Sequence, residues 1–129
     1  MIYIPVKKNI FNGLKTQCAQ LGIETVEILP DLLDFTLVVD ALFGFSFRGP
    51  IREPYKAVID ALANSKTPVL AVDVPSGWDV ESGDVYKTSY VPAAVVSLTA
   101  PKLCLKSYAG VHFIGGRLSL TSIRLSWVI

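Results

Sequence analysis

Two short apolar runs dominate the hydrophobic pattern of this chain, and each of them stops on an aspartate. The first is Leu37-Val38-Val39-Asp40 and the second is Val69-Leu70-Ala71-Val72-Asp73. Runs this short, rich in Val and Leu and bounded by Pro or Gly, are typical of buried parallel strands. Because the segment between them has a helical pattern from Pro54 to Ala63, the pattern predicts a βαβ unit.

This unit places the two aspartates at one edge of the sheet. Parallel strands joined by a crossover helix point the same way, so Asp40 and Asp73 are both expected at the carboxyl ends of strands, where open α/β sheets bind ligands. Strand-end aspartates also cap loops, and spacing alone leaves that alternative open.

The rest of the pattern predicts an α/β chain. We expect further strands over residues 2–4, 24–29, 93–99 and 111–114, and helices over residues 8–21 and 101–107. Residues 74–92 have no periodicity and predict a long loop, a feature that is often functional in compact domains.

Composition narrows the class of protein. With 129 residues, 51% hydrophobic and 18% charged, the chain fits one folded domain. A net charge of +1 with scattered basic residues argues against nucleic acid or an anionic membrane as partner, and no apolar run reaches membrane-spanning length. Two cysteines, Cys18 and Cys104, are too few for a disulfide framework.

The mean hydropathy of +0.47 is high for so small a domain, which indicates that part of the chain that would naturally cover its apolar surface is missing.

The residues after each aspartate favour a binding site. Asp40 is followed by a loop with two glycines, an arginine suited to phosphate and phenylalanines that could wall a ring, namely Gly44, Phe45, Ser46, Phe47, Arg48, Gly49 and Pro50. Asp73 is followed by a turn that contains Ser76. A carboxylate, a hydroxyl and turn carbonyls suit an alkali or alkaline-earth cation, although Ser76 fits equally well as a simple turn cap.

Other candidates are weaker. Thr99 and Lys102 follow a third parallel strand and are expected at the same edge, but Lys102 fits a solvated surface lysine equally well. His112 is the only histidine and lies in a predicted strand, where a lone histidine is more often packed or exposed than catalytic. No GxSxG, HExxH, Walker A or GxGxxG motif is present, so the common serine hydrolase, zincin, P-loop and dinucleotide dehydrogenase signatures are absent.

Four longer motifs resemble a known family. The segments VVDALFGFSFRGPIREP, AVDVPSGWDVESGD, VSLTAPK and YAGVHFIGGR are similar to the YjeF N-terminal domain family, and most of all to its NAD(P)HX epimerases, also called apolipoprotein A-I-binding proteins. The resemblance runs over residues 2–118 and implies a Rossmann-like, three-layer α/β/α fold with a mostly parallel sheet. The implied activity is repair of nicotinamide cofactors, by interconversion of the R and S forms of hydrated NADH and NADPH.

The resemblance also implies roles for residues. Asp40 and Ser76 match a potassium site, Gly44 through Pro50 match a substrate-binding loop, and Asp73 matches a carboxylate that contacts substrate. We further hypothesise that Asp73 is the acid/base group, because epimerisation needs proton transfer near the hydroxylated carbon.

The front of the chain departs from the family. Family members have an earlier strand and an Asn-Asn-Gly-Gly-Asp loop, and nothing in residues 1–30 matches them. In the strand order 3-2-1-4-5 that first strand is central, so we expect two half-sheets with open apolar inner edges, poor folding or self-pairing, and weak or absent epimerase activity. Residues 119–129 diverge from the family as well, which leaves residues 1–118 as a partial domain.

Partners and alternatives follow from the same resemblance. It implies NADHX and NADPHX as substrates, a homodimer, apolipoprotein A-I as a protein partner, and a cytoplasmic or mitochondrial location with secretion in some members. A different class of function is a non-catalytic dimerising or protein-interaction domain, since YjeF-type domains also act as scaffolds. An NAD-dependent oxidoreductase is disfavoured by the absence of GxGxxG.

Overall fold

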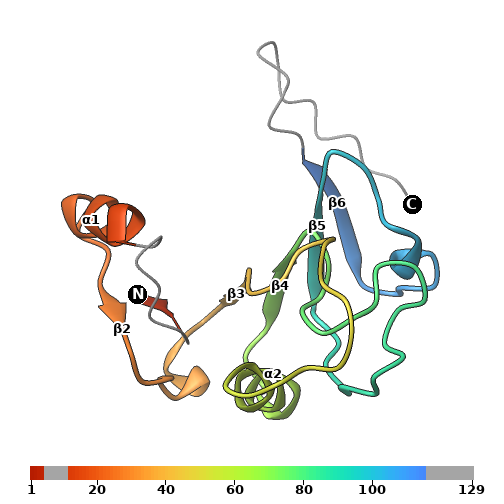
Figure 1. The fold of residues 1–129 in the computed structure, drawn as a ribbon, viewed down its shortest axis with the longest axis horizontal. Coiled ribbons are helices and arrows are strands. Elements are labelled where there is room, and N and C mark those ends of the chain that lie inside the picture. The colour runs from red at the N-terminus through yellow and green to blue at the C-terminus, as the bar shows by residue number, and fades with distance from the viewer. Residues whose placement is uncertain (5–11, 116–129) are drawn as a thin grey trace.

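The computed structural model describes residues 1–4 and 12–115 of the chain (Figure 1). Its elements in chain order are β1 (Ile2–Tyr3), α1 (Asn12–Gln20), β2 (Thr25–Val26), the 3₁₀ helix η2 (Leu32–Asp34), β3 (Val38–Asp40), α2 (Tyr55–Asn64), β4 (Val69–Val72), β5 (Ala94–Leu98), the 3₁₀ helix η3 (Leu103–Leu105) and β6 (Val111–Gly115). The predicted helix start at residues 8–11 and the divergent tail at residues 119–129 lie outside the described residues.

The strands form two separate parallel sheets. The larger sheet has the order β3-β4-β5-β6 and the smaller one pairs β1 with β2. In the larger sheet, Asp40 of β3 lies beside Ala71 of β4, and Val72 lies beside Val96 of β5. The α/β class and the expected division into two sheets are therefore both present in the structure.

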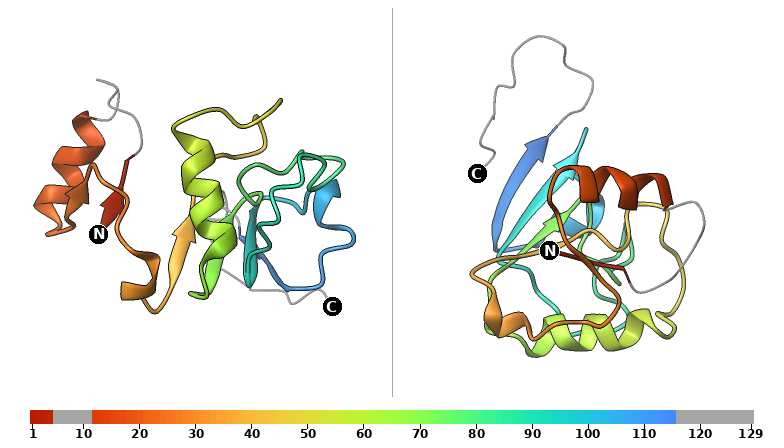
Figure 2. Two further views of the ribbon diagram at one scale, coloured as in Figure 1. Left: turned by 90° about the horizontal axis from the view of Figure 1, so that it is seen from below. Right: turned by 90° about the vertical axis from the view of Figure 1, so that its left-hand side faces the viewer.

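The helices cover the strands from two sides. The crossover α1 runs from β1 to β2 and α2 runs from β3 to β4, and the two helices lie on opposite sides of the strands (Figures 1 and 2). Helix α2 buries one face through Val58, Ile59 and Leu62, the spacing of an amphipathic helix. This arrangement matches the layered α/β/α architecture that was expected.

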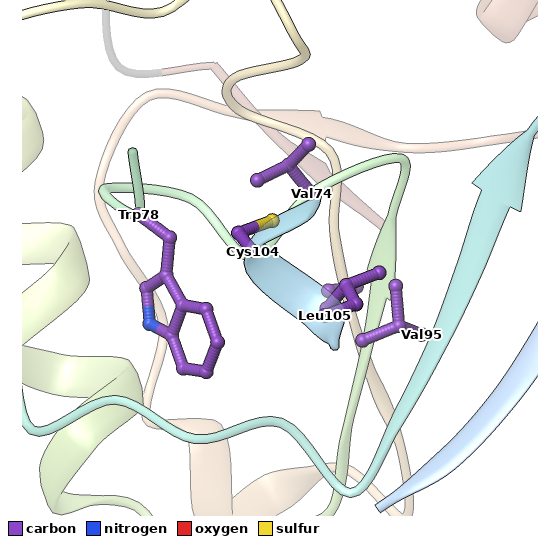
Figure 3. Packing of buried hydrophobic residues seen from close by; sticks show 6 residues of the cluster. Val74, Trp78, Val95, Cys104 and Leu105 are labelled. Carbon is purple, nitrogen blue, oxygen red and sulfur yellow. The ribbon is translucent and has the colours of Figure 1, made fainter. Parts of the chain in front are cut away.

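Two apolar clusters hold the larger sheet in place. In one of them, Trp78 and Cys104 pack with residues of β4, β5 and η3, as Figure 3 shows; its buried members are Ala71, Val74, Trp78, Val95, Cys104 and Leu105. The other lies against α2 and consists of Leu32, Ile59, Leu62, Val69 and Tyr90. Because both clusters draw residues from the loop after β4, that loop is anchored although it has no regular structure.

A cavity separates the two sheets. It has a volume of about 460 Å³, and residues of β1 and β3 line it from either side together with Leu32, Val58 and Leu62. Val38 donates its N–H to Pro68 on the β4 side, so by the alternation of a parallel ladder the N–H and C=O of Val39 face the cavity. The side chain of Val39 is 56% exposed, which makes this inner edge of β3 both open and apolar.

Two predicted elements are shorter in the structure, and one short helix was not predicted. The strand expected over residues 24–29 is reduced to β2 because the chain turns away before Pro30, which leaves Ile28 exposed. The helix expected over residues 101–107 is only the single turn η3. The turn at residues 31–34 is η2, and the Asp31 carboxylate caps it by accepting from the N–H of Leu33.

None of the helices in the described ranges is long and apolar enough to cross a membrane.

Candidate functional site

The structure brings the two predicted aspartates to the same edge of the larger sheet. Asp40 is the last residue of β3 and Asp73 directly follows β4, the neighbouring parallel strand. Both side chains are buried, with residue exposures of 2% for Asp40 and 5% for Asp73. A buried carboxylate needs hydrogen-bond donors or a cation beside its oxygens, and these groups differ between the two aspartates.

Asp40 is held by the turn after β4. Its Oδ1 accepts from the Ser76 hydroxyl at 2.6 Å and from the Leu42 N–H at 3.3 Å, and its Oδ2 accepts from the Ser76 N–H at 2.8 Å. The same hydroxyl oxygen of Ser76 accepts from the Phe43 N–H at 3.0 Å. Ser76 therefore ties the loop after β3 to the loop after β4.

Asp73 is held by the loop after β3 and by a lysine. Its Oδ2 accepts from the Phe45 N–H at 2.9 Å, and its Oδ1 pairs with the Lys102 Nζ at 2.6 Å. Burial raises the pKa of this carboxyl group, but the Lys102 ammonium and the Phe45 N–H outweigh it, so the pKa of Asp73 lies below its ordinary value. The group is therefore ionised at neutral pH.

Asp73 also forms part of the wall of an open pocket of about 680 Å³. The pocket lies at the carboxyl ends of β3, β4 and β5, and its lining residues are Ala41, Phe43, Gly44, Phe45, Ser46, Val72, Asp73, Val80, Leu98, Thr99, Ala100 and Lys102. Asp40 and Ser76 do not line it, because their polar atoms are turned to one another behind the Phe43 backbone.

The predicted substrate loop divides into two parts. Gly44, Phe45 and Ser46 line the pocket, and the Phe45 ring is exposed although its N–H is bound. The second part, Phe47 to Pro50, does not line it. Phe47 stacks on Phe43 with a centroid distance of 4.4 Å, and the Gly49 N–H donates to the Tyr86 hydroxyl, so these residues support the loop from behind.

Backbone strain gathers around the pocket. Asp73 and Thr99 have φ angles of 73° and 70°, in the left-handed region that residues other than glycine rarely adopt. For the β-branched Thr99 this conformation is unusual, and such outliers cluster at functional sites. A Cβ atom on Gly44 would lie 3.2 Å from Asp73 Oδ2, so glycine allows the loop to approach the carboxylate closely.

A second feature lies beside Asp40. The hydroxyl of Tyr90 is buried and makes no hydrogen bond, while burial and the negative charge of Asp40 raise the pKa of this phenol. Asp40 forms no ion pair with any cationic side chain in residues 1–4 and 12–115. A buried carboxylate without a counter-charge and an unsatisfied hydroxyl are oxygen donors of the kind that an alkali cation uses. Within the same ranges no three His, Cys, Asp or Glu side chains cluster as a metal site.

Other candidate residues stand outside the pocket. His112 exchanges a hydrogen bond of 2.8 Å with Ser97 on the adjacent strand, and partial burial lowers its pKa. Burial raises the pKa of the Cys104 thiol to about 11, so this cysteine is a core residue and not a nucleophile. Arg48 is exposed.

Sequence reasoning missed two residues of the site. Lys102 was placed at the correct edge but could not be distinguished from a surface lysine, because nothing in the spacing showed that its side chain turns back toward Asp73. Tyr90 lies in the aperiodic loop, where no pattern marked it as buried. The position of Lys102 four residues after the end of a buried strand was the only available signal.

The contacts of Ser76 lead to a prediction on stability. Ser76→Ala removes a hydroxyl donor from the buried Asp40 carboxylate and the acceptor of the Phe43 N–H, so we expect a loss of about 1–3 kcal/mol in the free energy of unfolding. Urea unfolding measures this loss, and the exposed Ser107→Ala is the matched control. Faster hydrogen exchange at the Phe43 amide should accompany it; equal unfolding midpoints for both variants would contradict the prediction.

Comparison with known proteins places this chain in a family. Residues 6–104 match the model of the family described as YjeF-related protein N-terminus. The chain is 47% identical to the NAD(P)H-hydrate epimerase of Dictyostelium discoideum over 90% of this chain and 52% of that protein, and 44% identical to the one of Aspergillus fumigatus over 95% and 53%. The crystal structure of yeast ynu0 superposes with a TM-score of 0.80 at 32% identity, over 91% of this chain and 54% of that one. The chain spans about half the length of the curated relatives it matches. It belongs to the YjeF-related protein N-terminus family.

Proposed function

We propose that this chain carries the substrate pocket of an NAD(P)H-hydrate epimerase, which interconverts the R and S forms of hydrated NADH and NADPH. The observation that carries the proposal is the ionised Asp73 carboxylate, fixed from both sides in the wall of an open pocket. The names of the relatives from Dictyostelium and Aspergillus support it, and none of these findings favours the non-catalytic scaffold.

Asp73 serves as the acid/base group in this proposal. Epimerisation requires a bond to the hydroxylated ring carbon to break and to re-form on the other face, and a carboxylate within hydrogen-bond reach can accept the hydroxyl proton as the ring carbon–nitrogen bond breaks and return it as that bond closes again. Each carboxylate oxygen has more than one lone pair, so Asp73 can accept a substrate proton while it keeps its bonds to Phe45 and Lys102.

The loop after β3 supplies the remaining contacts with substrate. The exposed Phe45 ring offers an apolar face for the nicotinamide ring, and Gly44, which has no side chain, lets the loop lie close to the Asp73 carboxylate. Arg48 lies further along the same loop and offers a planar fork for the dinucleotide phosphates. The substrates NADHX and NADPHX contain both a nicotinamide-derived ring and dinucleotide phosphates.

A potassium ion is proposed beside Asp40 and Ser76. The fit rests on the uncompensated buried carboxylate and on the buried Tyr90 hydroxyl that lacks a partner. Bound there, the cation supplies a positive charge that neutralises Asp40 and stabilises the two loops that Ser76 joins. Asp40 and Ser76 hold the ion, and they do not take part in proton transfer.

Association with a second copy is also proposed. The exposed inner edge of β3 has unpaired backbone groups and an apolar surface, a combination that favours pairing with another chain. Apolipoprotein A-I as a partner and a cytoplasmic or mitochondrial location rest on the family resemblance alone, and a pull-down with purified apolipoprotein and fractionation of the source cells test them.

Asp73→Asn tests the catalytic role. The amide cannot accept the proton, so we expect turnover of NADPH hydrate to fall by at least about 100-fold while substrate still raises the thermal midpoint of the protein. Asp34→Asn, an exposed aspartate in η2, is the matched control and should keep its activity. Full turnover by the Asp73 variant with bound substrate would remove the proposed role.

Comparing potassium chloride with choline chloride at equal ionic strength tests the cation site. A cation that binds only the folded state must stabilise it, so we expect a higher thermal midpoint in potassium chloride. Asp40→Asn removes the charge and should abolish the difference between the two salts, whereas Asp34→Asn should retain it. Equal midpoints for the unmodified chain would contradict the site.

Light scattering tests self-association. We expect a molar mass above 14.0 kDa that rises with concentration, since the open edge of β3 is available to a partner strand. Val39→Lys places a charge in that edge and should lower the mass toward the monomer. Leu33→Lys changes an equally exposed apolar residue outside the strands, and an identical effect of this control would show that the edge is not involved.

A further inference from the structure

We propose that Lys102 is a positioning residue for the reaction, which fixes the Asp73 carboxylate at the wall of the pocket. This inference rests on the proposed function, because it assigns Asp73 the acid/base role. Lys102 follows β5, whereas Asp73 follows β4, so the contact joins two neighbouring strand ends across the floor of the pocket.

The surroundings of the Lys102 ammonium show that it is already saturated. Its Nζ lies 2.6 Å from Asp73 Oδ1, and it donates to the backbone carbonyls of Leu98 at 2.7 Å and Ala100 at 3.0 Å. An ammonium has three N–H donors, and these three oxygens match that number. The group therefore has no donor left for a substrate phosphate, and it acts on the substrate only through Asp73.

The backbone turn after β5 positions the two carbonyls that accept from the Lys102 ammonium. Thr99 adopts a left-handed conformation with φ of 70°, which folds the chain so that the carbonyls on either side of it face the Lys102 side chain. The side chain is only 16% exposed, so water screens its interaction with Asp73 weakly. The left-handed conformation is unfavourable for a β-branched residue such as Thr99. Its role in placing the two carbonyls at the Lys102 ammonium explains why the turn keeps it.

The two oxygens of Asp73 are thus held from opposite sides. Lys102 fixes the buried Oδ1 through the ion pair of 2.6 Å, while the Phe45 N–H fixes Oδ2. With both ends restrained the carboxylate cannot rotate, and its remaining lone pairs keep one orientation toward the pocket. Fixed orientation of a reacting group is worth orders of magnitude in rate, because small misplacements reduce it strongly.

Lys102 also controls the charge of Asp73. It is the cationic group that lowers the pKa of this carboxyl, and the other titratable group nearby is the Cys104 thiol of η3, which is neutral at physiological pH. Without the ammonium, burial would remain as the main influence and would raise the pKa of Asp73. A base whose rate depends on the ionised form would then lose activity at a higher pH than before.

The experiment compares Lys102→Met, Lys102→Arg and the control Lys106→Met in the full chain. Lys106 is an exposed lysine four residues away, so its variant removes the same charge from the surface. Three quantities are measured for each variant: the ¹³C carboxyl titration of Asp73, the thermal midpoint, and the pH profile of kcat and KM with NADPH hydrate. Lys102→Gln, which keeps a donor for the carbonyls, replaces Lys102→Met if the latter does not unfold cooperatively.

We expect Lys102→Met to move the Asp73 titration and the acid limb of the rate profile to higher pH. Its kcat should fall by about 10- to 100-fold with less than a threefold change in KM. Lys102→Arg, which keeps the charge, should restore the Asp73 titration and part of kcat, and Lys106→Met should match the unmodified chain.

An unchanged Asp73 titration in folded Lys102→Met would overturn the inference, as would an unchanged kcat and pH profile in an active chain. If no variant turns over NADPH hydrate, the proposed function fails, yet the Asp73 titration still decides whether Lys102 controls this carboxylate. The two failures are therefore distinguishable.

Discussion

The need to satisfy a buried carboxylate at the end of β3 organises this molecule. Asp40 is almost fully removed from water, and the Ser76 hydroxyl and N–H meet its two oxygens from the next strand end. Buried carboxylate oxygens without hydrogen-bond donors would be strongly destabilising, and the turn after β4 follows a path that delivers the two donors of Ser76 to them. The Phe43 N–H joins the same hydroxyl, and the loop after β3 is fixed as a consequence.

Asp73, at the end of the neighbouring strand β4, is also a buried carboxylate, but its surroundings differ from those of Asp40. Asp40 does not line the pocket and borders the cavity between the two sheets instead, while Asp73 keeps its ionised group in the wall of the pocket. Asp40 has no cationic side chain beside it in the described ranges, whereas Asp73 has Lys102. One carboxylate is therefore suited to holding a bound cation, and the other to chemistry on a substrate.

Much of the fold followed from the sequence because buried strands and an amphipathic helix leave periodic signals. The ends of β3 and β4 and the helix between them were predictable in this way, whereas a shared site of Asp40 and Ser76 was implied only by the family resemblance. The ion pair of Lys102 was not, because the direction of a long side chain depends on the left-handed turn at Thr99, which no pattern of apolar residues encodes. The burial of Tyr90 depends on how an aperiodic loop packs, and local sequence does not determine that.

The separation into two sheets has a consequence for how the molecule opens. Every residue that lines the pocket of Asp73 comes from residues 41–102, and none comes from β1, α1 or β2. Opening of the two-stranded sheet would therefore remove no wall of this pocket, because segments with few contacts to the rest of a protein can open separately. The pocket of Asp73 is built by a part of the chain that contains neither β1, α1 nor β2.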